Sequence, residues 1–254
     1  MIAPNKDTVG CRECLKTDKP IFDFEFAFQP IVNVVTQTIY AHEALVRGPF
    51  GESAYSVLSQ VTESNRYTFD QACRVKAVET AAGLEMKSLL SINFLPNAVY
   101  RPEACIRTTL AAARKYGFPI ENIIFEVTEG EKVEDRPHLV NIFNEYRRLG
   151  FRTAIDDFGA GYAGLNLLAE YQPHIIKIDM DLVRNVDASK SRQTIVEGIV
   201  QMCRKLDIVL IAEGIETKPE RDFLRAVGIE LMQGYLFCKP AFKSLGIVEA
   251  EAWI

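Results

Sequence analysis

The chain has 254 residues, of which 48% are hydrophobic, enough apolar material for the core of one large α/β domain. Its formal net charge is −5. Proteins that hold nucleic acid polymers by releasing counterions need a surplus of Lys and Arg, so this charge argues against that class. Residues 1–10 contain no apolar segment typical of a signal peptide, and no apolar run is long enough to cross a bilayer. We therefore expect a cytoplasmic protein.

The first 20 residues differ from the rest of the chain, because they are polar and contain two prolines. We predict an extension at 1–20, followed by a single domain at 21–254. The six cysteines are scattered, and most lie within or beside apolar segments, which indicates reduced thiols rather than a disulfide framework. Cys11 and Cys14 have the spacing of half a zinc site or of a redox pair. Because no second pair follows, a loosely packed extension is favoured over either function.

Strands and helices are predicted to alternate along the chain. Apolar runs rich in β-branched and aromatic residues predict strands, and apolar residues at three- and four-residue spacing predict helices. In chain order, these are strands at 24–32 and 38–48, a helix at 54–79, a strand at 89–94, a helix at 103–116, a strand at 122–127, a helix at 137–149, strands at 151–156 and 174–179, a helix at 191–206, a strand at 207–214, a helix at 218–227 and a strand at 229–237. Only residues 34–37 separate the first two strands, too few for a crossover helix, so these two must pair antiparallel.

The most informative pattern is that apolar runs end repeatedly at acidic, amide or lysine side chains. The residues are Glu43, Asn93, Glu126, Asp156 with Asp157, Lys177, Glu213 and Gln233. An open sheet gathers only the strands beside its switch point, whereas in a closed barrel the carboxyl ends of all strands meet at one mouth. Because so many strands contribute, the pattern favours a TIM-like (β/α)8 barrel with an antiparallel first strand.

Carboxylates gathered at one mouth repel one another unless cations lie between them. Oxygen ligands without neighbouring Cys or His suit hard cations such as Mg²⁺ or Mn²⁺. A single carboxylate at a strand end is most often a helix cap, but capping does not require Asn93, Lys177 and Gln233 as well. The ring therefore predicts a metal-ion site.

The stretch Glu43-Ala44-Leu45, followed by Arg47, resembles the signature of the EAL-domain family, bacterial phosphodiesterases that cleave cyclic di-GMP. Further similar stretches follow the family's order: Gln29-Pro30-Ile31, Asn93, Glu126-Val-Thr-Glu129, Asp156-Asp157-Phe-Gly-Ala-Gly161, Lys177-Ile-Asp179, Ala212-Glu213-Gly-Ile-Glu216 and Gln233-Gly-Tyr-Leu-Phe237. The likeness covers roughly residues 24–242. It implies a barrel with an antiparallel first strand and metal-dependent hydrolysis of cyclic di-GMP to linear pGpG.

The resemblance also implies roles for individual residues. Two Mg²⁺ or Mn²⁺ ions would be held by Glu43, Asn93, Glu126, Asp156, Asp157 and Glu213, with Asp156 between them. Lys177, Glu213, Gln233 and Glu129 would serve catalysis, Glu129 by anchoring the loop after the double aspartate. The substrate would contact Gln29, Arg47, Asp179, Glu216 and Pro240. A two-fold homodimer, coupled to that loop, is the assembly that the resemblance implies.

The loop from Asp157 to Gly164 departs from the family pattern, which carries Thr at 160 and Ser at 163 and 164. Losing these hydroxyls affects the hydrogen bonds of the loop rather than the metal ligands. Its Gly159-x-Gly161-x-x-Gly164 spacing also fits a dinucleotide fingerprint, but the two carboxylates before it would repel a pyrophosphate. The stronger alternative is a weakly active or non-catalytic cyclic di-GMP receptor. Such receptors lack ring members and none is missing here, yet low turnover with signalling through a partner would leave the same sequence.

Overall fold

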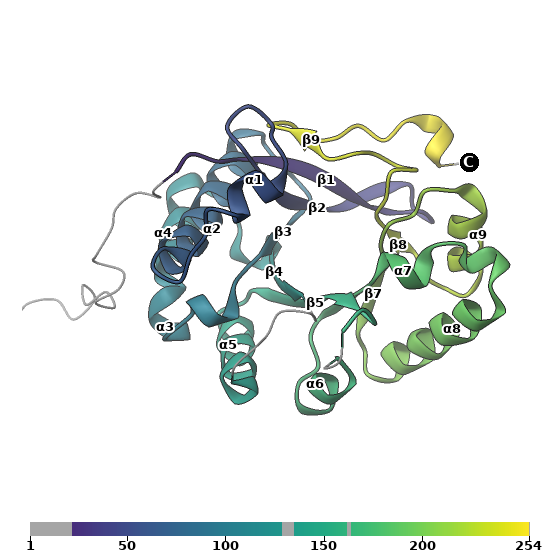
Figure 1. The fold of residues 1–254 in the computed structure, drawn as a ribbon. Helices are drawn as coiled ribbons and strands as arrows, with labels where there is room; N and C mark the ends of the chain where they lie inside the picture. The colour runs from purple at the N-terminus through teal and green to yellow at the C-terminus, as the bar shows by residue number, and fades with distance from the viewer. Residues whose placement is uncertain (1–21, 129–134, 162–163, 254) are drawn as a thin grey trace, which may run out of the picture.

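The computed structural model describes residues 22–128, 135–161 and 164–253, which form a barrel of strands surrounded by helices (Figure 1). The strands are β1 (Glu25–Asn33), β2 (Thr38–Arg47), β3 (Leu89–Asn93), β4 (Ile123–Thr128), β5 (Arg152–Phe158), β6 (Ile175–Ile178), β7 (Val209–Ala212), β8 (Leu231–Met232) and β9 (Ala241–Phe242). The helices are α1 (Ala54–Leu58), α2 (Arg66–Gly83), α3 (Pro102–Cys105), α4 (Arg107–Tyr116), α5 (Arg136–Arg148), α6 (Gly164–Glu170), α7 (Met180–Val183), α8 (Lys190–Lys205) and α9 (Lys218–Ala226).

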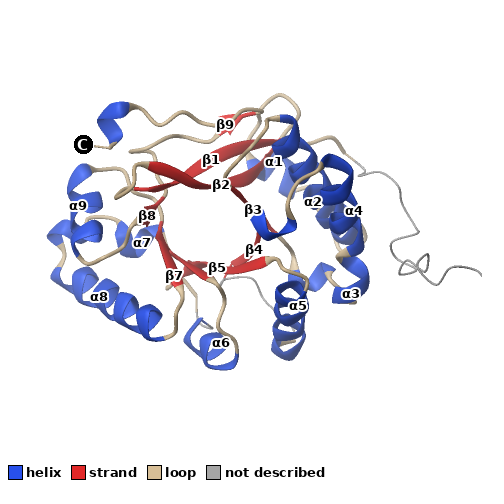
Figure 2. Ribbon diagram, turned by 180° about the vertical axis from the view of Figure 1, so that it is seen from behind, coloured by secondary structure: helices blue, strands red, loops and turns tan. Residues whose placement is uncertain are grey.

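The barrel closes through its first strand. Strands β2 to β8 are neighbours in chain order and pair parallel, whereas β1 pairs antiparallel with both β2 and β8. The helices lie outside this ring of strands, as Figure 2 shows from the opposite side. The predicted TIM-like barrel with an antiparallel first strand is therefore confirmed.

A small apolar cluster fills the inside of the barrel and supports the polar ring above it. It consists of Ile31, Ala41, Ile124, Ala154, Ile175, Ile211 and Leu231, all buried. Successive residues of a strand face opposite sides, so residues two apart share the inner face. Ile124 lies two residues before Glu126 and Ile211 two residues before Glu213. The same spacing that buries the cluster therefore places the polar side chains one layer nearer the mouth.

Some predicted elements are shorter than the sequence indicated. The helix predicted at 54–79 is two helices, α1 and α2, because Asn65 bonds the backbone of Thr62 and Gln60 between them. The strand predicted at 229–237 ends at Met232, where the chain turns against the neighbouring loop: a Cβ at Gly234 would lie 2.0 Å from the carbonyl oxygen of Ile215. Strand β9, which pairs with β1, was not predicted.

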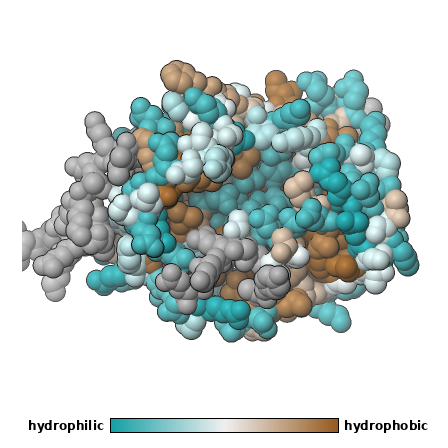
Figure 3. Space-filling view, in the orientation of Figure 1, coloured by the Kyte–Doolittle hydropathy of each residue, from teal (hydrophilic) through white to brown (hydrophobic). Residues whose placement is uncertain are grey.

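The face toward the viewer in Figure 3 carries hydrophilic residues in a hollow over the centre of the barrel. Among the described residues, none of the helices combines the length and apolar character that a bilayer crossing demands. The predicted extension at 1–20, with Cys11 and Cys14, and the predicted loop anchor Glu129 lie outside the described residues.

Candidate metal centre

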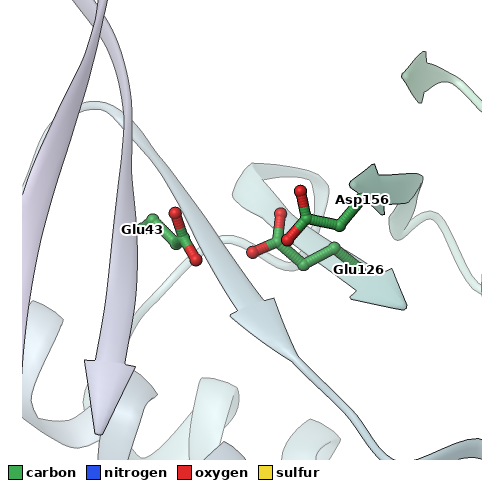
Figure 4. Close-up of side chains that lie close together, drawn as sticks. All are labelled: Glu43, Glu126 and Asp156. Carbon is green, nitrogen blue, oxygen red and sulfur yellow. The ribbon is translucent and has the colours of Figure 1, made fainter. Parts of the chain in front are cut away.

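Neighbouring strand ends bring the predicted residues into one layer at the mouth of the barrel. Asn93 on β3 stands beside Glu126 on β4 in the parallel register. Gln29 on β1 faces Glu43 on β2 across the antiparallel pair. The carboxyl groups of Glu43, Glu126 and Asp156 point toward one another from three strands (Figure 4). Residues more than 100 positions apart in the chain thus meet at one site, as expected for barrel strand ends.

Lys177 lies at the centre of this layer and is 1% exposed. Its Nζ is 2.7 Å from Glu213 Oε1, 3.1 Å from Asp156 Oδ1, 3.3 Å from Glu126 Oε2 and 3.4 Å from Glu43 Oε2. Burial alone would lower the pKa of Lys177, but the four carboxylates together raise it well above its usual value. The neighbouring carboxylates therefore favour the charged form of Lys177, in which its Nζ donates hydrogen bonds.

The carboxylates fall into two groups that share one member. Oxygens of Glu43, Glu126 and Asp156 lie within 4.8 Å of one another, and so do oxygens of Asp156, Asp157 and Glu213. Burial raises the pKa of Glu126 and of Glu213 well above the usual value, and neighbouring carboxylates raise both further. Burial, followed by the charge of Asp156, raises the pKa of Asp157 to about 6. This is excess negative charge of the kind that divalent cations neutralise.

A bulge in β5 places two consecutive aspartates at the mouth. In the pairing with β6, Ile155 faces Ile176 but the next pair is Phe158 with Ile178, so β5 contains one extra residue. Asp157 occupies that stretch with a φ of 53°, and its N–H donates to Asp156 Oδ1 at 2.9 Å. Asp and Asn tolerate this left-handed conformation better than most residues.

The side-chain amides connect the carboxylates to one another. Asn93 Nδ2 donates to Glu43 Oε1 at 3.1 Å and to Glu126 Oε1 at 3.0 Å. Gln233 Nε2 donates to Glu43 Oε2 at 2.8 Å and to Gln29 Oε1 at 3.2 Å. Gln29 in turn donates to the carbonyl oxygen of Cys238 at 3.0 Å. The amides therefore fix the orientation of Glu43 on both of its oxygens.

A pocket of about 300 Å³ opens beside these groups. It is lined by Gln29, Glu43, Asp156, Asp157, Glu213 and Gln233, and by Asp179 and Glu216 among the predicted substrate contacts. Asp179 also caps α7, and Glu216 pairs with Arg184 at 2.9 Å. The two remaining predicted substrate contacts, Arg47 and Pro240, are not part of its lining, and Arg47 donates to the carbonyl oxygen of Val46.

Residues 21–240 match the EAL domain family. The chain is a member of the EAL family. This confirms the resemblance drawn from the motifs. Among solved structures, a standalone EAL protein from Vibrio cholerae in its c-di-GMP-bound form is 57% identical, with a TM-score of 0.89 over 92% of this chain and 99% of that one. Klebsiella pneumoniae BlrP1 in its manganese and cyclic diGMP complex at pH 9.0 is 36% identical, with a TM-score of 0.81 over 91% of this chain and 59% of that one.

Two curated relatives differ in what their names say they do. The blue light- and temperature-regulated antirepressor BluF of Escherichia coli is 34% identical over 92% of this chain and 58% of BluF. The cyclic di-GMP phosphodiesterase NbdA of Pseudomonas aeruginosa is 28% identical over 90% of this chain and 30% of NbdA. This EAL protein therefore spans less than two thirds of the length of either relative.

The sequence interpretation missed several residues that line or support the site of this EAL protein. Ser91 Oγ donates to Glu126 Oε2 at 2.6 Å. Its position two residues before Asn93 on the inner face of β3 could have revealed it. Leu45, Met180 and Tyr235 contribute to the wall of the pocket. No polar pattern marks these three. Leu45, two residues after Glu43 on β2, shares its face of the strand, whereas only the three-dimensional structure brings Met180 and Tyr235 to the pocket.

The residues present in this EAL protein fit divalent cations. The candidate ligand atoms are carboxylate and amide oxygens, which hard cations prefer. Gln233 Oε1 is buried and has no hydrogen-bond partner in the described part of the chain, so it can accept a hydrogen bond from a water molecule. Asn93 directs its amide nitrogen at the carboxylates, so binding a cation requires its amide to turn over and offer Oδ1.

Proposed function

We propose that this protein hydrolyses cyclic di-GMP to linear pGpG with the help of Mg²⁺ or Mn²⁺. The observation that carries the proposal is the complete ring of oxygen ligands, in which Asp156 belongs to both carboxylate groups. The solved relatives with cyclic di-GMP bound, one of them with manganese, and the relative named as a phosphodiesterase support the substrate.

Two cations fit the two groups better than one. Glu43, Asn93, Glu126 and Asp156 would hold the first, and Asp156, Asp157 and Glu213 the second. Bound cations would stabilise charge on a phosphodiester and promote ionisation of an attacking water. The physiological metal is Mg²⁺ or Mn²⁺ in this proposal, because both accept an all-oxygen ligand set.

The protein's own side chains supply donors and acceptors around the reacting phosphate. Lys177 would donate a hydrogen bond to the attacking water or to a non-bridging phosphate oxygen, as its raised pKa allows. Gln233 would orient water through its free Oε1. Arg47 would bind a phosphate after releasing the carbonyl oxygen of Val46. Gln29, Asp179, Glu216 and Pro240 would contact the nucleotide.

Assembly and domain organisation belong to the same proposal. The protein would act as a cytoplasmic homodimer, with a polar extension at 1–20 and the catalytic domain at 21–254. The loop after Asp157, anchored by Glu129, would couple the site to the dimer contact. Sedimentation of the parent protein and of a Glu129→Ala variant, each with turnover measured, tests the coupling. Parental turnover in that variant would contradict the anchor.

A cyclic di-GMP receptor with little or no turnover is the second candidate, because BluF, at 34% identity, is named an antirepressor. The two functions differ in whether the substrate is consumed. Purified protein incubated with cyclic di-GMP and Mg²⁺ or Mn²⁺ should yield pGpG, resolved by chromatography. Hydrolysis should stop with EDTA and return with either metal, while Ca²⁺, with its looser geometry, should bind and inhibit. Binding without any product would favour the receptor.

A further inference from the structure

A buried ion pair lies on the outer side of the barrel wall, away from the pocket. Asp70 and Arg74, one turn apart on α2, are 1% and 0% exposed in their side chains, and Arg74 Nη2 is 2.7 Å from Asp70 Oδ2. Replacing a buried ion pair with apolar side chains is often neutral or stabilising. Stability alone therefore gives no reason for this pair, and its other contacts point to a more specific use.

Both partners of the pair reach the segment that follows Asn93. Asp70 Oδ1 accepts a hydrogen bond from the N–H of Leu95 at 2.9 Å. The guanidinium carbon of Arg74 lies 5.3 Å from the ring centre of Phe94, the residue directly after Asn93. Phe94 N–H also donates to the carbonyl oxygen of Glu126. The pair thus holds the backbone and the adjacent side chain where β3 ends.

Further contacts fix the pair itself. Arg74 Nη1 donates to the hydroxyl of Tyr146 on α5 at 2.6 Å, and the guanidinium carbon lies 5.1 Å from the ring centre of Phe125. Phe125 directly precedes Glu126, as Phe94 follows Asn93. Consecutive residues of a strand face opposite sides of the sheet. Aromatic side chains that are held on the outer face of the barrel therefore set the direction of the neighbouring ligands on its inner face.

Packing holds this segment on one side, where Phe94 contacts the rings of Phe125, Phe143 and Tyr146, but not on the other. An apolar cavity of about 270 Å³ adjoins it and is lined by Asn93, Phe94 and Leu95 together with Asp70 and Leu58. On that side the segment has few neighbours to resist a shift. The hydrogen bond from Leu95 to Asp70 supplies the restraint that side chains in the cavity would otherwise give.

We propose that the Asp70–Arg74 pair, braced by Tyr146, positions Asn93 for divalent-cation binding. The inference rests on the proposed function, in which Asn93 is a ligand. Asp70 and Arg74 are positioning residues, since neither lines the pocket. Residues that orient metal ligands typically change metal affinity about 10- to 100-fold when removed.

The test is a double-mutant cycle on the full chain, with Mn²⁺ alone as the probe and calorimetry as the measurement. Asp70→Ala should lower Mn²⁺ affinity about 10- to 100-fold in the parent. In an Asn93→Ala background the same change should lower it by a clearly smaller factor, because one of the two ligands that the pair supports is gone and only the support of Glu126 through Phe125 remains. Equal losses in both backgrounds, or parental affinity in Asp70→Ala, would overturn the proposal.

Two further variants keep the test decisive. If Asp70→Ala does not fold, Tyr146→Phe removes only the hydroxyl that holds Arg74, and a loss of about two- to tenfold should become clearly smaller in the Asn93→Ala background. Arg221→Met is the control: Arg221 is also buried, and its hydrogen bonds within the described part of the chain go to the carbonyl oxygen of Ala252 and to Asp222, not to a candidate metal ligand. Arg221→Met should keep parental affinity. A matching loss there would mean general loosening and would overturn the positioning role.

The cycle is independent of turnover. A parent protein that binds Mn²⁺ but leaves cyclic di-GMP intact would refute hydrolysis and still allow the cycle to be read. If the parent protein cleaves cyclic di-GMP but the effects of Asp70→Ala and Asn93→Ala on Mn²⁺ affinity simply add, only the positioning role would be refuted.

Discussion

Asn93 and Glu126, on the β3–β4 side of the ring, are supported from behind by aromatic rings and a buried ion pair. Asp156 and Asp157, on the β5 side, owe their placement to a bulge and a left-handed backbone. Ligands can thus be directed by side chains packed on the far side of a strand or by the backbone itself. The first device is sensitive to substitutions far from the pocket, and the second to substitutions that restrict φ and ψ.

The largest loss of turnover should follow from removing a carboxylate ligand itself. Glu43→Ala and Glu213→Ala should each lower the turnover of cyclic di-GMP by orders of magnitude, because each removes a carboxylate from the shared ring. The measurement is kcat with saturating Mn²⁺. Glu197→Ala, an exposed carboxylate on α8, is the control and should behave as the parent. Near-parental turnover in Glu213→Ala would remove that residue from the site.

A substitution at Arg47 tests substrate binding separately from the metal ligands on the two sides of the carboxylate ring. Arg47→Ala should raise KM by about 10- to 100-fold through loss of a charge-assisted phosphate contact, with a smaller change in kcat. Steady-state kinetics with cyclic di-GMP measure both quantities. A fall in kcat without a rise in KM would place Arg47 in the chemical step instead.

The β5 side can be disturbed through its backbone alone. Gly159 has a φ of 102°, and a Cβ there would lie 2.5 Å from Leu182 Cδ1, so Gly159→Ala should cost about 1–3 kcal/mol and weaken Mn²⁺ binding. Gly198→Ala, within α8 and with open space around it, should instead stabilise the protein by about 0.5–1 kcal/mol. Thermal unfolding and Mn²⁺ titration follow both. Unchanged Mn²⁺ affinity in Gly159→Ala would mean that the backbone directly after the bulge does not set the ligand geometry.

Carboxylates on both sides have raised pKa values, and that of Asp157, half-buried on the β5 side, is raised to about 6. Below pH 6 its proton competes with the cation, so Mn²⁺ affinity should fall about tenfold per pH unit for each proton displaced. In metal-free protein the sign is opposite: the raised pKa stabilises the folded state below the unfolded value of 3.8, and this contribution is lost as pH rises to about 6. Asp157→Asn should reduce the slope of both profiles near pH 6, while Glu126 and Glu213 keep the remainder, and an unchanged slope would exclude Asp157 as a titrating group.

The sequence predicted the barrel, its antiparallel first strand and the residues that meet at the mouth, because apolar strand runs, a short first connection and polar strand ends are local patterns. The sequence could not reveal that Asp70 and Arg74 support residues next to the candidate metal ligands. On a helix with mixed charges, an acidic and a basic residue four apart are typical of an exposed face. Their burial depends on Phe94, Phe125 and Tyr146, which come from three other parts of the chain.

Nor could spacing alone reveal how the end of the barrel is built. Gln233 follows only two residues of regular strand, and the chain then turns tightly at Gly234 before β9 returns to β1. The predicted strand at 229–237 reads as continuous because the apolar run extends across this turn. The contact of Gly234 with the Ile215 backbone is a tertiary feature that no local pattern encodes.

The central claim is that this ring binds two divalent cations that share Asp156. Diffraction from crystals grown with Mn²⁺ and a hydrolysis-resistant cyclic di-GMP analogue, recorded at the manganese absorption edge, tests it most directly. We predict two anomalous peaks roughly 4 Å apart. One peak should lie beside Glu43, Asn93 and Glu126, the other beside Asp157 and Glu213, with Asp156 in contact with both. A single peak, or none within the ring, would contradict the account.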